Sequence, residues 1–366
     1  QAKTDLDEDD PFSTIRDRDI LLHHPYQSFN AVLDLLQHAA NDPNVLAIKQ
    51  TLYRTGRDSK VVEHLITAAH NGKDVSVVVE LRARFDEEAN LSMANRLQEA
   101  GVQVIYGVVG FKTHAKMMLI VRREGKNLRR YAHLGTGNYH PGTAKVYTDI
   151  GLMTAHSAIT HDVHSIFQQL SGMGKAIKLN HLLTSPFTLH TGLLKKINRE
   201  AKFAREGKPA HIIVKINAIN EPDVIKALYS ASQAGVKVEL IVRGACCLRP
   251  GIAGLSENIS VRALVGRFLE HSRIYWFGNN GKPEIYCSSA DWLERNLLRR
   301  VETCFPILEP ELAERVFVEE LQYCLQDNVQ SWQLGADGNY TKNVPQDGQA
   351  PFSAQAQLLN TLCRKR

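Results

Sequence analysis

The stretch Phe111-Lys112-Thr113-His114-Ala115-Lys116-Met117-Met118-Leu119 decides how this chain is interpreted, because it places an imidazole and an ammonium in an apolar, strand-like run. Side chains alternate between the two faces of a strand, so His114 and Lys116 are predicted to point to the same face. A nucleophilic nitrogen beside a cation suits chemistry on a phosphate. The stretch therefore predicts a strand that handles phosphate.

Two later features extend this prediction. Gly135-Thr136-Gly137-Asn138 is a turn of small residues, which can lie close to a phosphate and offer it backbone N–H groups, a hydroxyl and an amide. Asp149 follows, a carboxylate that could hold the His114 ring by its second nitrogen. We therefore expect a nucleophile in His114, a cation in Lys116, a phosphate cradle in the turn and an orienting acid in Asp149.

The same order of residues recurs in the second half of the chain. His271 precedes Arg273 and then Ser288-Ser289-Ala290-Asp291, and Glu302 follows Asp291 at the spacing that separates Asp149 from Asn138. The apolar run that ends in Arg82 is also similar to the run that ends in Arg243. These repeats predict an internal duplication of about 150 residues, each copy being one α/β unit. By the same logic, Glu302 is expected to orient the ring of His271.

Length and composition are those of a globular protein with two domains. The chain has 366 residues and a net charge of +5, and no apolar run approaches the ~20 residues that span a bilayer. So mild a charge argues against nucleic-acid binding and favours local arginine clusters that face an anion. The first residue is Gln, no signal peptide is visible and the six cysteines have no metal-ligand spacing, so we expect a cytosolic piece of a longer chain.

The apolar periodicity predicts strands that alternate with helices, and hence a mostly parallel sheet covered by helices in each copy. Helices are expected at 25–40, 58–69, 87–100, 156–170, 193–204, 221–234 and 310–326, and strands at 45–52, 74–81, 102–106, 211–216, 237–242 and 259–264, besides the two histidine strands. The acidic run 1–11 is interpreted as a linker, 12–180 as the first domain and 181–366 as the second. The polar tail from Val344 is expected to be peripheral.

Three histidines at 156, 161 and 164 invite a metal interpretation, but their spacing matches no standard ligand set. We expect these side chains to cap the helix or to be exposed to solvent. His133 and His140, which flank the small-residue turn, could either donate hydrogen bonds to the groups that contact phosphate or simply pack. Tyr147 could be a core aromatic with a satisfied hydroxyl.

On these residues the sequence resembles a known superfamily. The paired His-x-Lys and His-x-Arg motifs, each followed by a small-residue turn and an acid, are similar to the phospholipase D superfamily. Closer still, Thr113-His114-Ala115-Lys116, Tyr131-Ala132-His133-Leu134-Gly135-Thr136-Gly137-Asn138-Tyr139-His140 and Tyr147-Thr148-Asp149-Ile150-Gly151-Leu152 look like the bacterial polyphosphate kinases. The stretches 48–54 and 80–86 match that family's other signatures. The resemblance runs from about Pro11 to near the end and covers the family's two carboxyl-terminal domains.

The resemblance implies a fold and an activity. The fold would be two phospholipase D-like α/β domains from an internal duplication, with the active site between them. The activity would be reversible transfer of the ATP γ-phosphoryl group to inorganic polyphosphate through a phosphohistidine, with Mg²⁺ and with ATP or ADP as substrate. The implied partners are polyphosphate, the missing amino-terminal domains and further copies in a homo-oligomer, without nucleic acid. The implied location is the cytoplasm, with a peripheral place at the inner membrane.

The resemblance also implies roles for single residues. His114 would be phosphorylated, and His271 would act as an acid or base or contact nucleotide phosphates. Tyr147 and Arg243 match nucleotide-contacting positions, and Arg54 and Arg84 match the phosphate and magnesium site. A guanidinium cannot ligate Mg²⁺, so these two arginines are expected to hold the phosphate oxygens that carry the metal.

Further cations are expected around the polyanion, namely Lys116, Arg273 and Arg82. A surface salt bridge is the alternative for arginines at strand ends.

Two other functions stay open at this point. One is a phosphodiesterase or phosphatidyltransferase of the wider superfamily, although Arg273 in place of Lys and Asp291 in place of Asn argue against it. The other is a non-catalytic module that binds polyanions, since missing domains could be needed to complete the nucleotide site.

Overall fold

The computed structural model describes residues 4–53, 59–81, 87–172 and 177–363, and the chain divides into two compact units. Unit 1 comprises Gln1–Leu182 together with Arg300–Glu302, and unit 2 comprises Leu183–Arg299 together with Thr303–Arg366. The change at Leu182 lies close to the boundary expected at residue 180. The membership of Arg300–Glu302 in unit 1 is a finding that the sequence did not predict.

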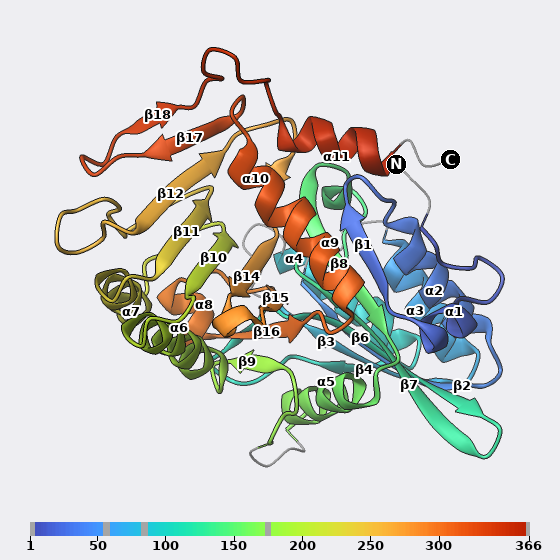
Figure 1. Cartoon of the computed structure of the whole chain (residues 1–366). Coiled ribbons are helices and arrows are strands. Elements are labelled where there is room, and N and C mark those ends of the chain that lie inside the picture. The colour runs from blue at the N-terminus through green and yellow to red at the C-terminus, as the bar shows by residue number, and fades with distance from the viewer. Residues whose placement is uncertain (1–3, 54–58, 82–86, 173–176, 364–366) are drawn as a thin grey trace. The chain divides into compact units, whose positions relative to one another are not determined.

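Unit 1 is built on a mixed sheet with the strand order β1-β8-β7-β6-β2-β3-β4 (Figure 1). Its strands are β1 (Ile20–His24), β2 (Val45–Leu52), β3 (Asp74–Val79), β4 (Gln103–Ile105), β5 (Lys112–Thr113), β6 (Lys116–Glu124), β7 (Asn127–Gly135) and β8 (Tyr147–Thr154). Its helices are α1 (Pro11–Asp17), α2 (Asn30–Asn41), α3 (Lys60–His70), α4 (Glu87–Glu99), the short 3₁₀ turn η1 (Thr143–Lys145) and α5 (Ser157–Leu170).

The core of unit 1 lies between its sheet and the apolar faces of its helices. Val32, Leu35 and Leu36 recur at helical spacing on α2 and are buried, as an amphipathic helix requires. They join the β2 and β3 side chains Ile48 and Val77 in one cluster. Helix α5 contacts β6 and β7. This packing holds strand β6, and the His114 segment immediately precedes the start of that strand.

Unit 2 has the strand order β18-β17-β12-β11-β10-β14-β15-β16. Its strands are β9 (Leu183–Ser185), β10 (His211–Ile216), β11 (Lys237–Val242), β12 (Ile259–Leu264), β13 (Leu269–Glu270), β14 (Arg273–Phe277), β15 (Glu284–Ser288), β16 (Arg300–Pro306), β17 (Ser331–Leu334) and β18 (Tyr340–Lys342). Its helices are α6 (Leu189–Arg205), α7 (Pro222–Gln233), η2 (Asn279–Gly281), α8 (Glu294–Leu298), α9 (Pro310–Val316), the π-helical η3 (Phe317–Gln322), α10 (Tyr323–Gln326) and α11 (Ala354–Leu362).

Helices cover the central strands of unit 2 (Figure 1). Helices α6 and α7 lie side by side and contact β10 and β11, whereas η3 contacts β10 and β14. The side chains of Val214 and Ile216 join the cluster under α6 and α7. Lys215 stands between them in sequence, so it faces the other side of β10, where η3 lies.

The two units repeat one topology. The order β8-β7-β6-β2-β3-β4 of unit 1 recurs as β16-β15-β14-β10-β11-β12 in unit 2. Each step of this order has the same sense in both units: β2 and β3 pair in parallel, as do β10 and β11, and β2 pairs antiparallel with β6 as β10 does with β14. The predicted internal duplication is confirmed.

The expectation of a mostly parallel sheet is wrong for both units. Within the described part of unit 1, β2, β3 and β4 pair in parallel, while β1, β6, β7 and β8 pair antiparallel. The reason is the short connection between β6 and β7, since tight hairpins join only antiparallel neighbours and parallel strands need a longer crossover.

The expectation of a peripheral tail holds for residues 344–351, which are exposed, but is wrong for α11. Ala354, Gln355 and Leu358 of α11 are buried. The amide of Gln355 donates to the carbonyl oxygen of Phe268 at 2.9 Å and to the carboxylate of Glu270 at 2.7 Å. These hydrogen bonds of Gln355 leave no apolar signal of burial in the sequence. Of the predicted tail, residues 364–366 lie outside the described residues.

All six cysteines are free thiols. None of the helices in the described part of the chain has both the length and the apolar character needed to cross a membrane.

Candidate active site

His114 lies in the break between β5 and β6, beside a segment from much later in the chain. Strand β16 runs parallel to β5, pairing Arg300 with Lys112 and Val301 with Thr113. The N–H of His114 donates to the carbonyl oxygen of Val301 at 2.8 Å. The next residue is Glu302, whose Oε2 lies 2.9 Å from Nδ1 of His114. Because a carboxylate accepts, Nδ1 carries the ring proton and Nε2 keeps its lone pair.

This pair is buried. Glu302 is inaccessible to solvent and His114 is 8% exposed, so little water competes for the interaction. A carboxylate in a site of low polarity stabilises the positive charge that develops on an imidazole when its other nitrogen forms a bond. The geometry is therefore that of a nucleophilic histidine with an orienting acid.

The acid is not the one that the sequence predicted. Asp149 was expected at the ring of His114, and Glu302 at the ring of His271, whereas Glu302 is the carboxylate at Nδ1 of His114. Oδ1 of Asp149 accepts a hydrogen bond from the hydroxyl of Thr136 at 2.7 Å. The prediction was wrong because it paired each acid with the histidine of its own copy, and β16 delivers Glu302 to β5 instead.

The turn 135–138 is organised around Asp149. Thr136 is fully buried, its N–H donates to the carbonyl oxygen of Ile150 at 3.0 Å, and its hydroxyl is taken by Asp149. The expectation that this hydroxyl binds phosphate is therefore wrong. Gly137 must be glycine, since a Cβ there would lie 2.1 Å from Oδ2 of Asp149. In the described structure Oδ1 of Asn138 has no hydrogen-bond partner, so this carboxamide is the turn's candidate contact with a ligand.

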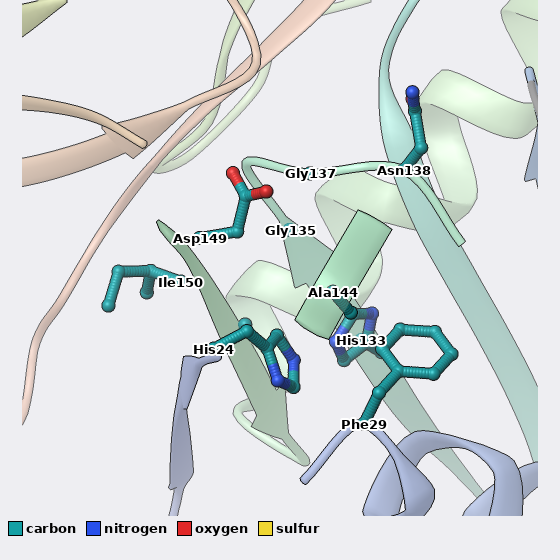
Figure 2. Close-up of a pocket in the computed structure, with 10 residues that line it drawn as sticks. His24, Phe29, His133, Gly135, Gly137, Asn138, Ala144, Asp149 and Ile150 are labelled. Atoms are coloured by element: carbon teal, nitrogen blue, oxygen red, sulfur yellow. The ribbon is translucent and has the colours of Figure 1, made fainter. Parts of the chain in front are cut away.

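A small pocket lies beneath this turn (Figure 2). The rings of His24, Phe29 and His133 gather on one side of it, and the carboxylate of Asp149 points away from them. Burial, assisted by the neighbouring His24, lowers the pKa of His133 to about 3. Its Nδ1 lies 2.8 Å from the hydroxyl of Tyr139. His133 is thus a neutral ring that packs under the turn.

His140 also serves the local backbone, because its Nδ1 accepts hydrogen bonds from the N–H groups of Gly142 and Thr143, both at 3.1 Å. Packing and capping therefore explain both histidines that flank the turn.

Three residues fix the immediate surroundings of His114. Lys116 is buried, and its ammonium donates to the carbonyl oxygen of His114 and lies 5.4 Å from the centroid of the Tyr53 ring. The Tyr53 ring meets the His114 ring edge-on, with centroids 5.1 Å apart. Oε2 of Glu80 accepts from the N–H of Thr113 at 2.9 Å. Sequence reasoning missed Tyr53 and Glu80 as site residues, although both directly follow strands, at the strand ends where α/β sheets bind ligands.

His271 has a different neighbour. NH1 of Arg273 lies 3.3 Å from Nε2 of His271, and because a guanidinium only donates, Nε2 is the acceptor. Arg273 in turn makes two contacts with Asp291, from Nε at 3.2 Å and from NH2 at 3.0 Å. Burial favours the neutral form of Asp291, but the charge of Arg273 outweighs it and holds the pKa of Asp291 below its ordinary value.

The backbone around His271 is fixed by Arg243 and Asn217. Nε of Arg243 donates to the carbonyl oxygen of Glu270 at 2.8 Å and to Oδ1 of Asn217 at 3.0 Å. Nδ2 of Asn217 donates to the carbonyl oxygen of His271 at 3.2 Å. Arg243, predicted as a nucleotide contact, thus lies beside His271, and Asn217 is a residue that sequence reasoning missed.

Of the other predicted residues, the structure describes Tyr147 but not the three arginines. Tyr147 begins β8 and is half-buried. Arg54, Arg82 and Arg84 lie outside the described residues.

His156 accepts from the N–H of Ile159 at 3.4 Å as the N-cap of α5, which confirms a capping role for this histidine. Among the described residues, the side chains close enough to share one ion are His190, Glu221 and Asp223 in unit 2, and no predicted metal residue is among them.

Two units of one strand order, each with a His-x-Lys or His-x-Arg motif at the start of its central hairpin, define a protein built from two copies of one mixed α/β fold. The crystal structure of phosphatidylserine synthase from Haemophilus influenzae shares this fold, with a TM-score of 0.56 over 93% of this chain and 92% of that one, at 12% identity.

The chain belongs to the polyphosphate kinase family, because the family's "Polyphosphate kinase C-terminal domain 1" matches residues 10–176 and its "Polyphosphate kinase C-terminal domain 2" matches residues 182–355. The predicted family and fold class are confirmed.

Two polyphosphate kinases illustrate the similarity. The protein of that name from Xylella fastidiosa is 66% identical over 98% of this chain and 52% of its own length. The crystal structure of polyphosphate kinase from Porphyromonas gingivalis has a TM-score of 0.89 at 39% identity, covering 96% of this chain and 54% of that one. The chain therefore spans about half the length of the relatives that it matches.

Proposed function

We propose that this chain is the catalytic region of a kinase that transfers the γ-phosphoryl group of ATP reversibly to inorganic polyphosphate, through a phosphohistidine at His114. One observation carries the proposal: a buried histidine whose Nδ1 is held at 2.9 Å by the buried carboxylate of Glu302. Membership of the polyphosphate kinase family supports the choice of substrates.

The first step forms a bond between Nε2 of His114 and the γ-phosphorus as the bond from that phosphorus to the β-phosphate oxygen breaks, and ADP leaves with the electron pair. Glu302 holds the Nδ1–H and stabilises the charge on the ring. In the second step an oxygen of the polyphosphate terminus attacks the phosphorus, the N–P bond breaks and the ring regains its lone pair. The reverse sequence regenerates ATP.

Phosphoryl transfer depends mainly on positioning and on neutralising charge. We assign Mg²⁺ to the nucleotide substrate, where it would neutralise the phosphate oxygens. The arginines implied for this role, Arg54 and Arg84, offer guanidinium donors to phosphate and no lone pair to a metal. Arg82 and the carboxamide of Asn138 are proposed as further phosphate contacts.

The second half supplies the accessory groups of the proposal. His271 would act as an acid or base or contact nucleotide phosphates, and Tyr147 and Arg243 would contact the nucleotide. Arg273 is paired with Asp291, so we propose that it tunes His271 rather than binding phosphate itself.

Family resemblance alone is the ground for the remaining parts of the proposal. These are a homo-oligomer, a cytoplasmic place at the inner membrane, and cooperation with the region that the longer relatives have in addition.

The test is to trap the phosphoenzyme in the full natural protein. Wild type, His114→Gln and His161→Gln are incubated with γ-³²P-labelled ATP and Mg²⁺, and the label is tested for acid lability and alkali stability. His161 is an exposed histidine of α5 and serves as the matched control. We expect acid-labile label on wild type and on His161→Gln and none on His114→Gln. Label that persists on His114→Gln, or no label on any of the three, would overturn the proposal.

A further inference from the structure

A buried group of charges lies under His271 in unit 2. Lys215 of β10 places its ammonium 2.6 Å from Oε2 of Glu270 and 2.5 Å from Oε2 of Glu320. All three side chains are at most 5% exposed. Burial alone would lower the pKa of Lys215, but the two carboxylates outweigh it and raise that pKa well above its ordinary value. Lys215 is therefore charged and lies between two buried carboxylates.

Glu320 reaches this cluster because its helix changes geometry. Helix α9 is α-helical to Val316, Phe317–Gln322 is π-helical, and α10 continues in α-helical form. A π-helical turn is rare and adds a residue to the turn, and it occurs often at functional positions. Here it contains Glu320, which is fully buried between Lys215 and Ser272.

The cluster holds the residues on both sides of His271. Glu270 precedes the histidine and binds Lys215 through Oε2, while its Oε1 accepts from Gln355 at 2.7 Å. Ser272 follows the histidine, and its hydroxyl donates to Oε2 of Glu320 at 2.6 Å. Residues two apart on an extended segment share a face, so Glu270 and Ser272 point to the cluster and His271 points to the opposite side.

We propose that Glu320 is a positioning residue, which with Lys215 fixes the backbone on both sides of His271 and so sets the direction in which its imidazole points. The side chain is anchored twice, to the strand β10 and to the residue after the histidine. The structural part of this proposal is independent of the reaction, and its consequence for catalysis rests on the proposed function.

A role in stability alone would not require these charges. Buried ion pairs are seldom more stabilising than apolar side chains of the same size, so a buried group of three ionisable side chains is a costly way to fill a core. The charged cluster instead orients the extended segment, because its bonds to Glu270 and Ser272 hold the residues on both sides of His271. A misplacement of about 1 Å at a reacting group can cost about a hundredfold in rate.

The test compares Glu320→Gln with Glu319→Gln in the full natural protein. Both residues belong to the same π-helical turn, but Glu319 accepts from Nε of Arg315 at 2.8 Å, so it serves as the matched control. Histidines are labelled with ¹³C at Cε1, and the signal of His271 is identified by its loss in His271→Gln. Phosphoryl transfer is measured alongside.

We expect Glu320→Gln to shift or split the His271 signal and to lower kcat by about tenfold to a hundredfold with little change in KM. Glu319→Gln should leave the signal and the rate as in wild type. Ser272→Ala, which removes only the hydroxyl, should reproduce the effect of Glu320→Gln, and the double variant should add little to it. If Glu320→Gln does not fold, Ser272→Ala carries the test.

An unchanged His271 signal in folded Glu320→Gln, or in folded Ser272→Ala, would overturn the positioning role whatever the activity. A signal that moves as expected in a protein that forms no phosphoenzyme would support the positioning role and reject the proposed function. The two proposals therefore fail in distinguishable ways.

Discussion

His114 and His271 hold equivalent places in two copies of one fold, yet different groups contact their rings. The ring of His114 meets the carboxylate of Glu302, and the ring of His271 meets the guanidinium of Arg273. The first environment stabilises a ring that becomes positive, whereas in the second the guanidinium that donates to the ring is itself paired with Asp291. Duplication has thus preserved the frame while the polar contacts diverged, which fits a nucleophile in unit 1 and an accessory group in unit 2.

The segments that carry the two histidines are also held differently. Gln50 pairs with Met118 in the antiparallel pair, so the next residue, Thr51, comes opposite Met117, while Lys215 pairs with Ile274. Met117 and Ile274 stand at the same distance in sequence from their histidines, so Thr51 and Lys215 occupy matching points of their sheets. Thr51 bonds the backbone directly: its hydroxyl donates to Ala115 at 2.7 Å and accepts from Met117 at 3.0 Å. Lys215 works through two carboxylates. One neutral side chain does in unit 1 what a charged cluster does in unit 2.

The largest effect is expected from breaking that charged cluster. Lys215→Met should lower the free energy of unfolding by about 3–5 kcal/mol, because Glu270 and Glu320 would stay buried without their lysine. Thr51→Val should cost about 1–2 kcal/mol, the price of two backbone groups left without a partner. Thermal unfolding of both variants measures the difference. Equal losses would contradict the distinction between a charged and a neutral anchor.

The next effect concerns the acid at His114. Glu302→Gln keeps the shape of the side chain but removes its charge, so phosphoenzyme formation should slow by about a hundredfold or more. Asp149→Asn should slow it by less than about tenfold, since the Oδ1 of Asp149 is bonded to Thr136 in the turn. Single-turnover labelling with ATP gives both rates. A larger loss in Asp149→Asn would reject the assignment of Glu302 as the orienting acid.

The two small-residue turns offer a steric comparison. Gly137 has no room for a Cβ beside Asp149, whereas the matching residue of unit 2 is Ala290, which is fully buried. Gly137→Ala should therefore cost about 2–3 kcal/mol of stability through overpacking. Ala290→Gly should cost about 1 kcal/mol through added chain freedom.

Both glycine-turn variants are compared by their unfolding midpoints. Removing the clash in Gly137→Ala/Asp149→Ala should recover part of the first loss, and failure to recover any would show that the clash is not its cause.

The smallest effect is a dependence on pH in unit 2. The pKa of Asp291 is lowered in the folded protein, so its contribution is present above its unfolded pKa of about 3.9 and is lost as the pH falls through the folded value. The stability difference between wild type and Asp291→Asn should therefore shrink as the pH falls below about 4. Denaturant unfolding across this range measures it. A gap that widens in acid would contradict the Arg273–Asp291 pairing.

The sequence predicted elements well where the pattern is local. The strands expected at 45–52, 211–216, 237–242 and 259–264 coincide with β2, β10, β11 and β12. These are runs of buried apolar residues whose pattern is complete within each segment. The two histidine segments were also identified, because each motif is followed by the same kinds of residue in the same order.

Sequence reasoning failed where the partner is distant. The spacing of Asp149 and Glu302 repeats faithfully, but a repeat cannot tell whether an acid serves its own copy or the other, since either arrangement preserves the spacing. His114 and Glu302 are 188 residues apart, and only the pairing of β5 with β16 brings them together. The role of Gln355 was missed for a similar reason, because its hydrogen bonds leave no apolar trace in the sequence.

Arg300–Glu302 belong to unit 1 although they lie late in the sequence, and this has a consequence for synthesis of the protein on the ribosome. When the strand that bears His114 emerges, the acid that completes its site is still 188 residues from being translated. At ordinary rates of elongation this gap lasts roughly 10–40 s. Through that interval the nascent histidine lacks its carboxylate, so under the proposed function His114 becomes fully reactive only after Glu302 has been made.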